Sequence, residues 1–211
     1  VYNPAADCYI NTNWFGGVWN AAVLCRSAAR GSADILCKFA TNNMYGLLEC
    51  TTHPQTGLPH QYYGQPVWFA WRLLQDRAGL RPGARIVSAD VRPGADQGID
   101  GYAITSSAGT RSAVIINRSF SDMRVVLDLR GDLARVSRIT RYRFDQERTA
   151  RFLGRRPGES AEGRYADSPD DSANTRSLAA LDRIAFHPHG HMLRLQPIVC
   201  PAVSLTVLTV A

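Results

Sequence analysis

The sequence predicts an α/β segment followed by an all-β, antiparallel sandwich. In the first third, short apolar runs alternate with stretches of helical periodicity. Beyond residue 85, apolar residues recur at every second position, as in half-buried strands. A Pro- and Gly-rich stretch, 77–85, separates the two patterns. We therefore expect two domains, residues 1–79 and residues 80–211.

Length, charge and composition exclude several classes of protein. The 211 residues are 45 % hydrophobic and 20 % charged, an ordinary globular composition. Since a membrane helix needs roughly 18 consecutive apolar residues, no membrane span is predicted. The net charge is +6 and Lys38 is the only lysine. The arginines are interspersed with acidic residues and do not form a basic stripe, so no nucleic-acid partner is expected. No cofactor is predicted.

The first third predicts two strand–helix units. The expected elements are a strand at Cys8–Asn11, a helix at Val18–Ala29 closed by Gly31, a strand at Ala33–Phe39 and a helix over 62–76. This alternation implies parallel strands joined by right-handed crossovers. Two such units are a quarter of a closed barrel and would leave large apolar faces exposed. The chain is then a fragment, or other units complete it.

Seven candidate strands follow, rich in β-branched residues and separated by Gly, Pro, Asp and Ser turns. They are Arg85–Val91, Gly101–Ser106, Ser112–Asn117, Arg124–Leu129, Arg135–Phe144, His191–Gln196 and Val203–Val210. Short strands at this spacing are typical of an antiparallel sandwich. Residues 154–177 have almost no apolar content, and we expect them to form an exposed, mobile insertion.

The cysteines have no metal-site spacing, and five of them cannot all pair within the chain. Cys25 and Cys37 lie in apolar segments and are expected to be buried thiols. A disulfide bond between Cys8 and Cys50 is possible, but no pattern in the sequence supports it.

Two further motifs are short and weak. Three alternate histidines in 186–192 could share one strand face, but Pro188 and Gly190 favour a turn, and no metal site is predicted. Asn117 begins an Asn-Arg-Ser sequon, but it ends a predicted strand and we do not expect it to be glycosylated.

Several stretches carry a family resemblance. They are "CYIN" (8–11), "ADILCKF" (33–39), "QYYGQPVWFAWRLLQD" (61–76), "SAVIINRS" (112–119) and "HMLRLQPIVCPAVSLTVLTV" (191–210). In order and spacing they resemble the C-terminal part of clan-A glycoside hydrolases of the family 39 and family 79 kind. The resemblance implies barrel strands seven and eight, the last barrel helix, and sandwich strands. The fold would be the end of a (β/α)8 TIM barrel followed by an antiparallel β-sandwich.

The resemblance also has implications for the partners and the location of the protein. The first six barrel units have no counterpart here, which implies a truncated or processed chain, or another polypeptide segment or chain that completes the barrel. It also implies an extracellular or lumenal location.

The chemistry implied by the resemblance has no obvious residues here. Retaining hydrolysis needs an acid and a nucleophilic carboxylate about 5–5.5 Å apart. The resemblance puts the acid after strand four, which is absent, and a glutamate nucleophile at the end of strand seven. That position is Asn13, or Thr12 if the alignment shifts by one, and neither can act as the nucleophile. Glu49 could substitute if its loop reaches the barrel mouth; otherwise it forms an ordinary surface ion pair.

The residues left at the predicted mouth suit sugar binding. Aromatic faces pack on pyranose rings, and asparagine both donates and accepts hydrogen bonds. The candidates are Asn11, Asn13, Trp14, Asn42, Asn43 and Tyr45. The alternative is that Trp14 and Phe15 fill the mouth or a partner interface while the asparagines make turns.

Three hypotheses follow. The first is a glycoside-hydrolase-like, catalytically degenerate chain with a structural or carbohydrate-binding role in a larger assembly. The second is the C-terminal portion of an active retaining glycosidase whose acid, with or without the nucleophile, lies on a missing segment or partner chain. The third is an unrelated β-sandwich interaction domain with a helical N-terminal extension.

Overall fold

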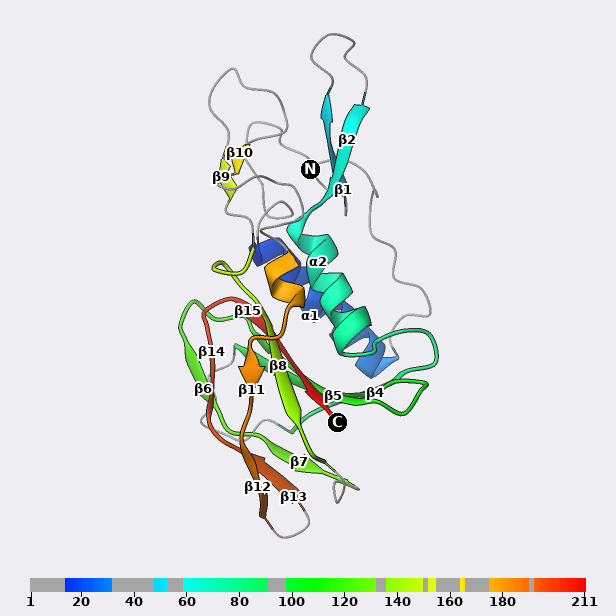
Figure 1. The fold of residues 1–211 in the computed structure, drawn as a ribbon, viewed down its shortest axis with the longest axis vertical. Coiled ribbons are helices and arrows are strands. Elements are labelled where there is room, and N and C mark those ends of the chain that lie inside the picture. Colours follow the sequence, from blue (N-terminus) through cyan, green and yellow to red (C-terminus); the bar gives the residue numbers. More distant parts are fainter. Residues whose placement is uncertain are drawn as a thin grey trace.

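The structure is a computed structural model that describes residues 14–31, 48–52, 59–90, 98–131, 136–149, 152–154, 164–165, 175–189 and 192–211. Two helices lie on one face of a six-stranded antiparallel sheet, and further strands lie on its other face (Figure 1). The antiparallel pairing predicted for the second part of the chain is confirmed. Strands 8–11 and 33–39, expected from the sequence, lie outside the described residues.

Both predicted helices are present, with different starts. α1 spans Trp14–Arg30, four residues longer at its N-terminus than expected, and Gly31 closes it at φ 56°. α2 spans Pro66–Arg72 and continues as a π-helical turn, Leu73–Arg77. The prediction of a helix from residue 62 is wrong, because residues 62–64 belong to a strand and Pro66 sets the helix start. Neither described helix has the length and apolar content needed to span a bilayer.

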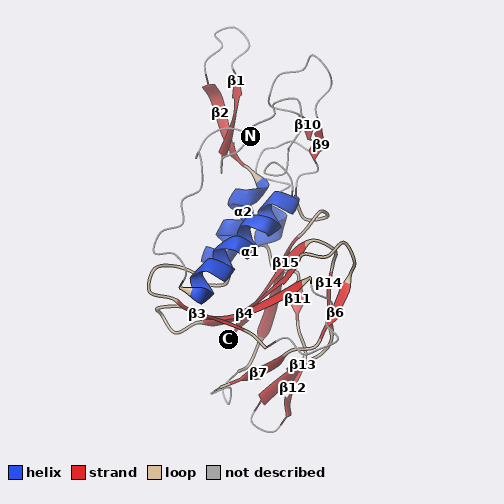
Figure 2. Cartoon of the chain, turned by 180° about the vertical axis from the view of Figure 1, so that it is seen from behind, coloured by secondary structure: helices blue, strands red, loops and turns tan. Residues whose placement is uncertain are grey.

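The six-stranded sheet is antiparallel throughout (Figure 2). Its spatial order is β11 (Asp182–Arg183), β8 (Ile139–Phe144), β15 (Ser204–Val210), β5 (Arg111–Asn117), β4 (Ile99–Thr105) and β3 (Arg85–Ser88). β5 and β15 pair along their full lengths, with Ser204 opposite Asn117 and Val210 opposite Arg111. The C-terminal strand is therefore at the centre of the sheet.

The second strand layer corrects one prediction. It contains β12 (Phe186–His189), β13 (Met192–Leu195) and β7 (Asp128–Arg130) in one sheet, and β14 (Ile198–Cys200) with β6 (Met123–Val125) in another. The single strand expected over Arg124–Leu129 is divided between these two sheets. β6 pairs with β14 and β7 pairs with β13, so the chain changes partner between residues 125 and 128.

Two hairpins were missed by the sequence analysis. β1 (Leu48–Thr52) pairs with β2 (Pro59–Gly64), and β9 (Phe152–Gly154) pairs with β10 (Arg164–Tyr165). Both hairpins lie at the end of the molecule opposite β12 and β13 (Figure 1). The β9–β10 hairpin falls partly within the expected insertion at 154–177, and a 3-10 turn at Arg176–Leu178 ends that segment with Ser177 fully buried.

The six-stranded sheet has a hydrophobic core on each face, because the side chains of a strand alternate. On β5, Val114 and Ile116 face the helices, whereas Ala113 and Ile115 face the second strand layer. The helix-side core also contains Val18, Ala21, Cys25, Phe69, Leu73, Leu74, Tyr102, Ile104, Phe144, Leu205 and Val207. The helices and the sheet thus bury one continuous apolar cluster.

An ion-pair cluster on Asp100 also joins α1 to the sheet. The Asp100 carboxylate on β4 binds Arg26 of α1 at 3.0 Å and Arg118, just after β5, at 2.7 Å. These bonds hold the C-terminal half of α1 against one end of β4 and β5.

The closest approach of α1 to the sheet is at Gly17. A Cβ at this position would lie 2.5 Å from Cζ of Phe144 and 3.2 Å from the Pro66 carbonyl oxygen. Both α2 and β8 therefore reach the α1 backbone at one point, and any side chain there would push them apart. This explains a glycine inside a helix, where it otherwise costs about 0.5–1 kcal/mol relative to alanine.

Gly17→Ala tests this contact. We expect a net loss of about 1–2 kcal/mol in the free energy of unfolding, since overpacking costs about 1–3 kcal/mol and the better helix propensity of alanine offsets part of it. Urea denaturation followed by circular dichroism measures the loss. The control is the same change in a Phe144→Leu background, where the smaller side chain should reduce the penalty. An equal penalty in both backgrounds would contradict the proposed clash.

Candidate functional site

Most of the residues predicted to form the site lie outside the described residues. These are Asn11, Thr12, Asn13, Asn42, Asn43 and Tyr45. Their convergence at a barrel mouth stays a prediction. The structure describes Trp14 in full and the backbone position of Glu49.

Trp14 is the first residue of α1 and is half-buried. Together with Phe15, it packs against the helix-side core. Its indole Nε1 is buried and has no hydrogen-bond partner among the described residues. The ring thus contributes to packing at the N-terminal end of α1, and a role in sugar binding stays a prediction.

Glu49 lies in β1, opposite Tyr63 of β2. The β1–β2 hairpin extends from the N-terminal end of α2, on the same side of the molecule as the N-terminal end of α1 (Figure 1). In a (β/α)8 barrel the active site lies at the C-terminal ends of the strands, which is where the helices that follow them begin. The backbone of Glu49 therefore lies on the side of the molecule where α1 and α2 begin, and its place at a barrel mouth stays a prediction.

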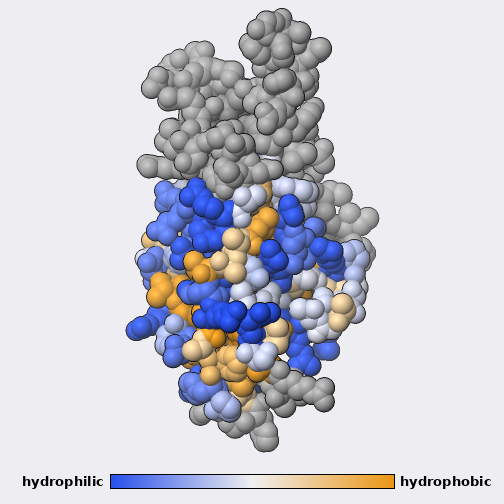
Figure 3. Space-filling model, in the orientation of Figure 1, coloured by the Kyte–Doolittle hydropathy of each residue, from blue (hydrophilic) through white to orange (hydrophobic). Residues whose placement is uncertain are grey.

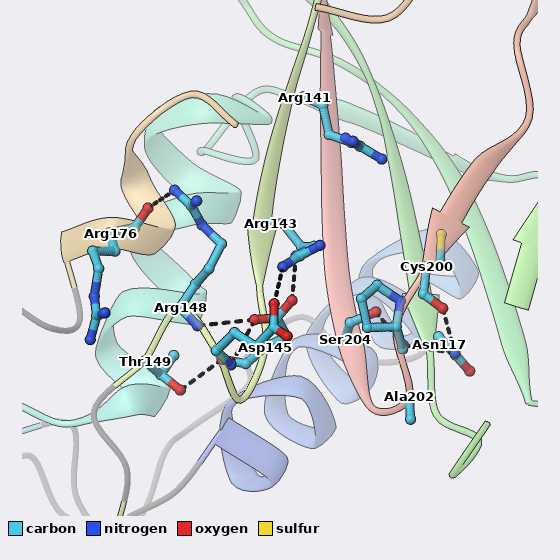
Figure 4. Close-up of polar contacts among 12 residues, drawn as sticks. Asn117, Arg141, Arg143, Asp145, Arg148, Thr149, Arg176, Cys200, Ala202 and Ser204 are labelled. Atoms are coloured by element: carbon cyan, nitrogen blue, oxygen red, sulfur yellow. Dashed lines mark hydrogen bonds and ion pairs between the residues drawn. The ribbon is translucent and has the colours of Figure 1, made fainter. Parts of the chain in front are cut away.

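A buried polar cluster was not anticipated from the sequence. Asp145 follows β8 and is buried, and its Oδ1 accepts hydrogen bonds from the backbone N–H groups of Glu147 and Arg148, both at 3.0 Å (Figure 4). Its carboxylate forms an ion pair with Arg143, and the Thr149 hydroxyl donates to its backbone carbonyl at 2.8 Å. The signal in the sequence is an aspartate followed by polar residues, which favours an Asx turn.

The surrounding charges connect this turn to the 3-10 turn at 176–178. Arg148 donates to the carbonyl oxygens of Arg176 and Ala179, the latter at 3.2 Å. Burial lowers the pKa of Arg148, and the positive charges of Arg143 and Arg176 lower it further. Burial also raises the pKa of Asp145, against the opposing effects of Arg143 and the two N–H donors.

A raised carboxyl pKa is found in many general acids, but Asp145 is fully engaged by its own turn. Both backbone donors and Arg143 occupy its oxygens. The nearby Glu147 side chain is 82 % exposed and is bound to Arg143 at 2.8 Å. The arrangement therefore fixes the end of β8 to the 3-10 turn, and we assign it no reaction.

Asn117 forms a second buried network. Its side-chain amide donates to the carbonyl oxygens of Ser121 at 2.8 Å, Cys200 at 3.1 Å and Pro201 at 2.8 Å (Figure 4). Its Oδ1 accepts from the backbone N–H and hydroxyl of Ser119, at 3.0 and 2.8 Å. Asn117 is fully buried. The sequon asparagine is thus inaccessible in the folded chain.

Cys25 and Cys200 are buried and free. Burial raises the pKa of Cys25 to about 12 and that of Cys200 to about 11. Neither is a thiolate near neutral pH, so neither serves as a nucleophile. The buried thiol expected at Cys25 is confirmed, whereas Cys8 and Cys37 lie outside the described residues.

Metal binding has no support from the described part of the chain, where no group of three His, Cys, Asp or Glu side chains could hold an ion. His187 lies on β12 opposite Arg194, and His191 lies outside the described residues.

No protein-family model and no curated protein sequence matches this chain. Solved structures do match it in fold. The catalytic domain of GH30 xylanase C from Talaromyces cellulolyticus matches with a TM-score of 0.53 and 14 % sequence identity. The match covers 95 % of this chain and 37 % of the xylanase chain. A GH30 endoxylanase from Clostridium papyrosolvens matches with a TM-score of 0.53 and 14 % sequence identity. The match covers 95 % of this chain and 39 % of the endoxylanase chain.

A third structure comes from another family of the clan. The GH51 arabinofuranosidase from Xanthomonas axonopodis pv. citri matches with a TM-score of 0.54 and 8 % sequence identity. The match covers 95 % of this chain and 36 % of the arabinofuranosidase chain. The chain is structurally similar to part of clan-A glycoside hydrolases. It spans well under half the length of the solved structures it matches. The assignment to families 39 and 79 stays a prediction.

The raised pKa of Asp145 predicts how Asp145→Asn changes stability with pH. The folded protein holds this proton to higher pH than the unfolded chain, so its contribution to stability is present below the ordinary pKa of 3.8 and is lost as pH rises through the folded-state pKa. The stability difference between wild type and variant should therefore shrink as the pH rises above about 4.

Urea denaturation at a series of pH values measures the difference. Asp182→Asn removes the ion pair between Asp182 of β11 and Arg141 of β8, and reports the cost of losing a more exposed pair. A difference that grows with pH would mean that attraction to Arg143 outweighs burial.

The Asn117 network predicts a large effect from a nearly isosteric change. Asn117→Asp replaces the donating amide by an oxygen that faces three carbonyl oxygens. We expect a loss of about 3 kcal/mol or more in the free energy of unfolding. Ser119→Ala abolishes the same sequon but removes one hydroxyl, and should cost about 1 kcal/mol. Peptide mass spectrometry of protein from a glycosylating host should find Asn117 unmodified; a glycan there on folded protein would refute the assignment.

Proposed function

We propose that the chain contributes the last two strand–helix units and the C-terminal sandwich of a clan-A glycoside-hydrolase-like protein whose catalytic site is degenerate. Its role is then structural or carbohydrate-binding within a larger assembly. The observation that carries this proposal is the mismatch in coverage, because the fold similarity extends over 95 % of this chain but 37 % of the xylanase C domain. The rest of such a fold must come from polypeptide outside residues 1–211.

The residues around the expected nucleophile position support a loss of catalysis. A retaining glycosidase needs a carboxylate to attack the anomeric carbon, and the stretch from Cys8 to Arg30 contains neither aspartate nor glutamate. The amide of Asn13 and the hydroxyl of Thr12 cannot supply the negative charge. In the described part of the chain, the aspartates at 76, 100, 128, 145 and 182 are all engaged by arginines.

Carbohydrate binding is the remaining role for the mouth residues. Asn11, Asn13, Trp14, Asn42, Asn43 and Tyr45 combine amides with aromatic rings, the pair of groups that sugars need. An extracellular or lumenal location belongs to the same proposal.

The alternative, an active glycosidase completed by another segment, is favoured by one observation. The hairpin that carries Glu49 lies beyond the N-terminal end of α2, on the side of the molecule where α1 also begins (Figure 1). A carboxylate delivered there could replace the missing nucleophile if the acid came from the absent part of the barrel.

A mechanism-based label separates the two. The native protein is incubated with activated 2-deoxy-2-fluoroglycosides, which trap the covalent glycosyl–enzyme intermediate of retaining enzymes. A degenerate site predicts no adduct on any peptide of this chain and no hydrolysis of aryl glycosides. A retaining glycosidase of known specificity serves as the positive control. An adduct on the peptide containing residues 8–14 or 48–52 would overturn the proposal.

Matched variants sharpen the outcome. Hydrolysis lost in Glu49→Gln but kept in Glu147→Gln, an exposed carboxylate at the end of β8, would establish the active alternative. A glycan array addresses the binding role, and absence of any bound glycan would leave a structural role alone. A native polypeptide that has the mass of residues 1–211, without a co-purifying partner, would favour an independent interaction domain.

A further inference from the structure

The loop between β5 and β6 presents an aromatic ring to solvent. Phe120, in the middle of this loop, is 81 % exposed, whereas Phe69 and Phe144 are fully buried. Its ring stacks on that of Phe15, the second residue of α1, with centroids 6.1 Å apart and an interplanar angle of 16°. The ring thus has a defined neighbour, and most of its surface is still open.

Backbone hydrogen bonds fix this loop on both sides of Phe120. Before it, the carbonyl oxygen of Ser119 accepts from the N–H of Val203 at 2.9 Å. After it, Oδ1 of Asp122 accepts from the N–H of Ala202 at 2.9 Å. The turn between β14 and β15 therefore holds both flanks of the ring. A ligand that binds to a ring held in this way loses less entropy, because no loop has to be ordered.

That turn contains a strained residue. Val203 has φ 45°, a conformation that β-branched residues rarely adopt. Its side chain is buried in the helix-side core and its N–H is bound to Ser119, so contacts on both sides keep it there. Backbone strain of this kind is found at sites where it fixes a functional group in place. Here the fixed group is the loop that carries Phe120.

Exposure alone does not indicate a site. On the face of the molecule seen in Figure 3, apolar residues are interspersed with hydrophilic ones, and single exposed apolar residues of that kind need no ligand to explain them. Phe120 differs because its ring is stacked and its loop is held by a strained turn.

The residues next to the ring indicate what kind of ligand it suits. Ser121 and Asp122 directly follow Phe120 and are exposed. An aromatic face beside hydroxyl and carboxylate groups suits a carbohydrate, because a pyranose packs its apolar face on the ring while its hydroxyls bond to the polar neighbours. A docked polypeptide would instead be expected to cover a larger contiguous apolar patch.

We propose that Phe120 is a carbohydrate-binding residue, on which one pyranose ring of a bound oligosaccharide stacks. This inference rests on the proposed function, which assigns sugar binding to Trp14 and to residues before it. Phe15 directly follows Trp14, so Phe120 lies beside the start of α1. The loop between β5 and β6 and the segment that leads into α1 then share one ligand.

Calorimetric titration of the native protein with xylohexaose, cellohexaose and mannohexaose tests the assignment. Phe120→Ala should weaken binding by about ten-fold, which is the upper range for loss of one aromatic contact. Phe120→Trp keeps an aromatic face and should bind as the wild type does. The matched control is Val126→Ala, since Val126 is 54 % exposed between β6 and β7, and it should leave the Kd unchanged. Circular dichroism checks that each variant is folded.

Two results of this titration would overturn the inference. One is a wild-type Kd in Phe120→Ala. The other is a wild-type Kd in Phe120→Leu, because leucine keeps apolar bulk but offers no aromatic face.

Cysteine labelling tests whether the ring position is open in the native protein. A maleimide should modify Phe120→Cys and Val126→Cys at similar rates, with the label located by peptide mass spectrometry. A saturating amount of the oligosaccharide that binds should slow labelling several-fold in Phe120→Cys alone. If Phe120→Cys stays unlabelled without sugar, another polypeptide segment covers the position and the inference is wrong.

Failure here is distinguishable from failure of the proposed function. Oligosaccharide binding that is lost in Trp14→Ala but unchanged in Phe120→Ala refutes this inference alone. A wild-type protein that binds none of the oligosaccharides refutes the carbohydrate-binding role, and this inference with it.

Discussion

The structure depends on burial of one sheet on both faces. β5 and β15 form its centre, and residues 112–117 of β5 are all buried. On one side Val114, Ile116 and Leu205 pack against the helices, and on the other Ala113 and Ile115 pack against the second strand layer. Separating the helices or the second strand layer from the sheet would expose a large apolar area, and each exposed Å² costs about 25 cal/mol in free energy. The helices and strands therefore stabilise one another and are not independent modules in packing terms.

Because the sheet is buried on both faces, the polar groups at the ends of its strands need hydrogen-bond partners within the protein. A strand that leaves such a sheet exposes backbone groups in an apolar setting, and these need partners. Asn117 performs this role at the end of β5, and Asp145 does so at the end of β8. Each side chain binds backbone groups of the turn that follows its strand. Both are buried polar residues of the kind that attracts functional interpretation, yet their bonds account for them through the fold alone.

The sequence predicts those helices and strands whose apolar residues follow a regular local period. Strands β5 and β15 and both helices were predicted because their side chains face a core with a regular period. Pairing partners depend on distant contacts, so the division of 124–129 between two sheets was missed. The start of α1 was placed late because Gly16 and Gly17 resemble a turn, whereas Gly17 is required by Phe144. Of the predicted site, only Trp14 and the backbone of Glu49 are described, so its geometry stays a prediction.

Architecture and chemistry in this fold rest on different residues, and this makes a degenerate site physically reasonable. The position of α1 is fixed by Gly17, by the Asp100 ion pairs and by the helix-side core. None of these groups belongs to the predicted catalytic position at Thr12 or Asn13. Exchanging a loop carboxylate for an amide removes a nucleophile without opening a cavity, whereas a methyl group at Gly17 would displace Phe144. The packing of α1 therefore does not depend on which residue stands at position 12 or 13.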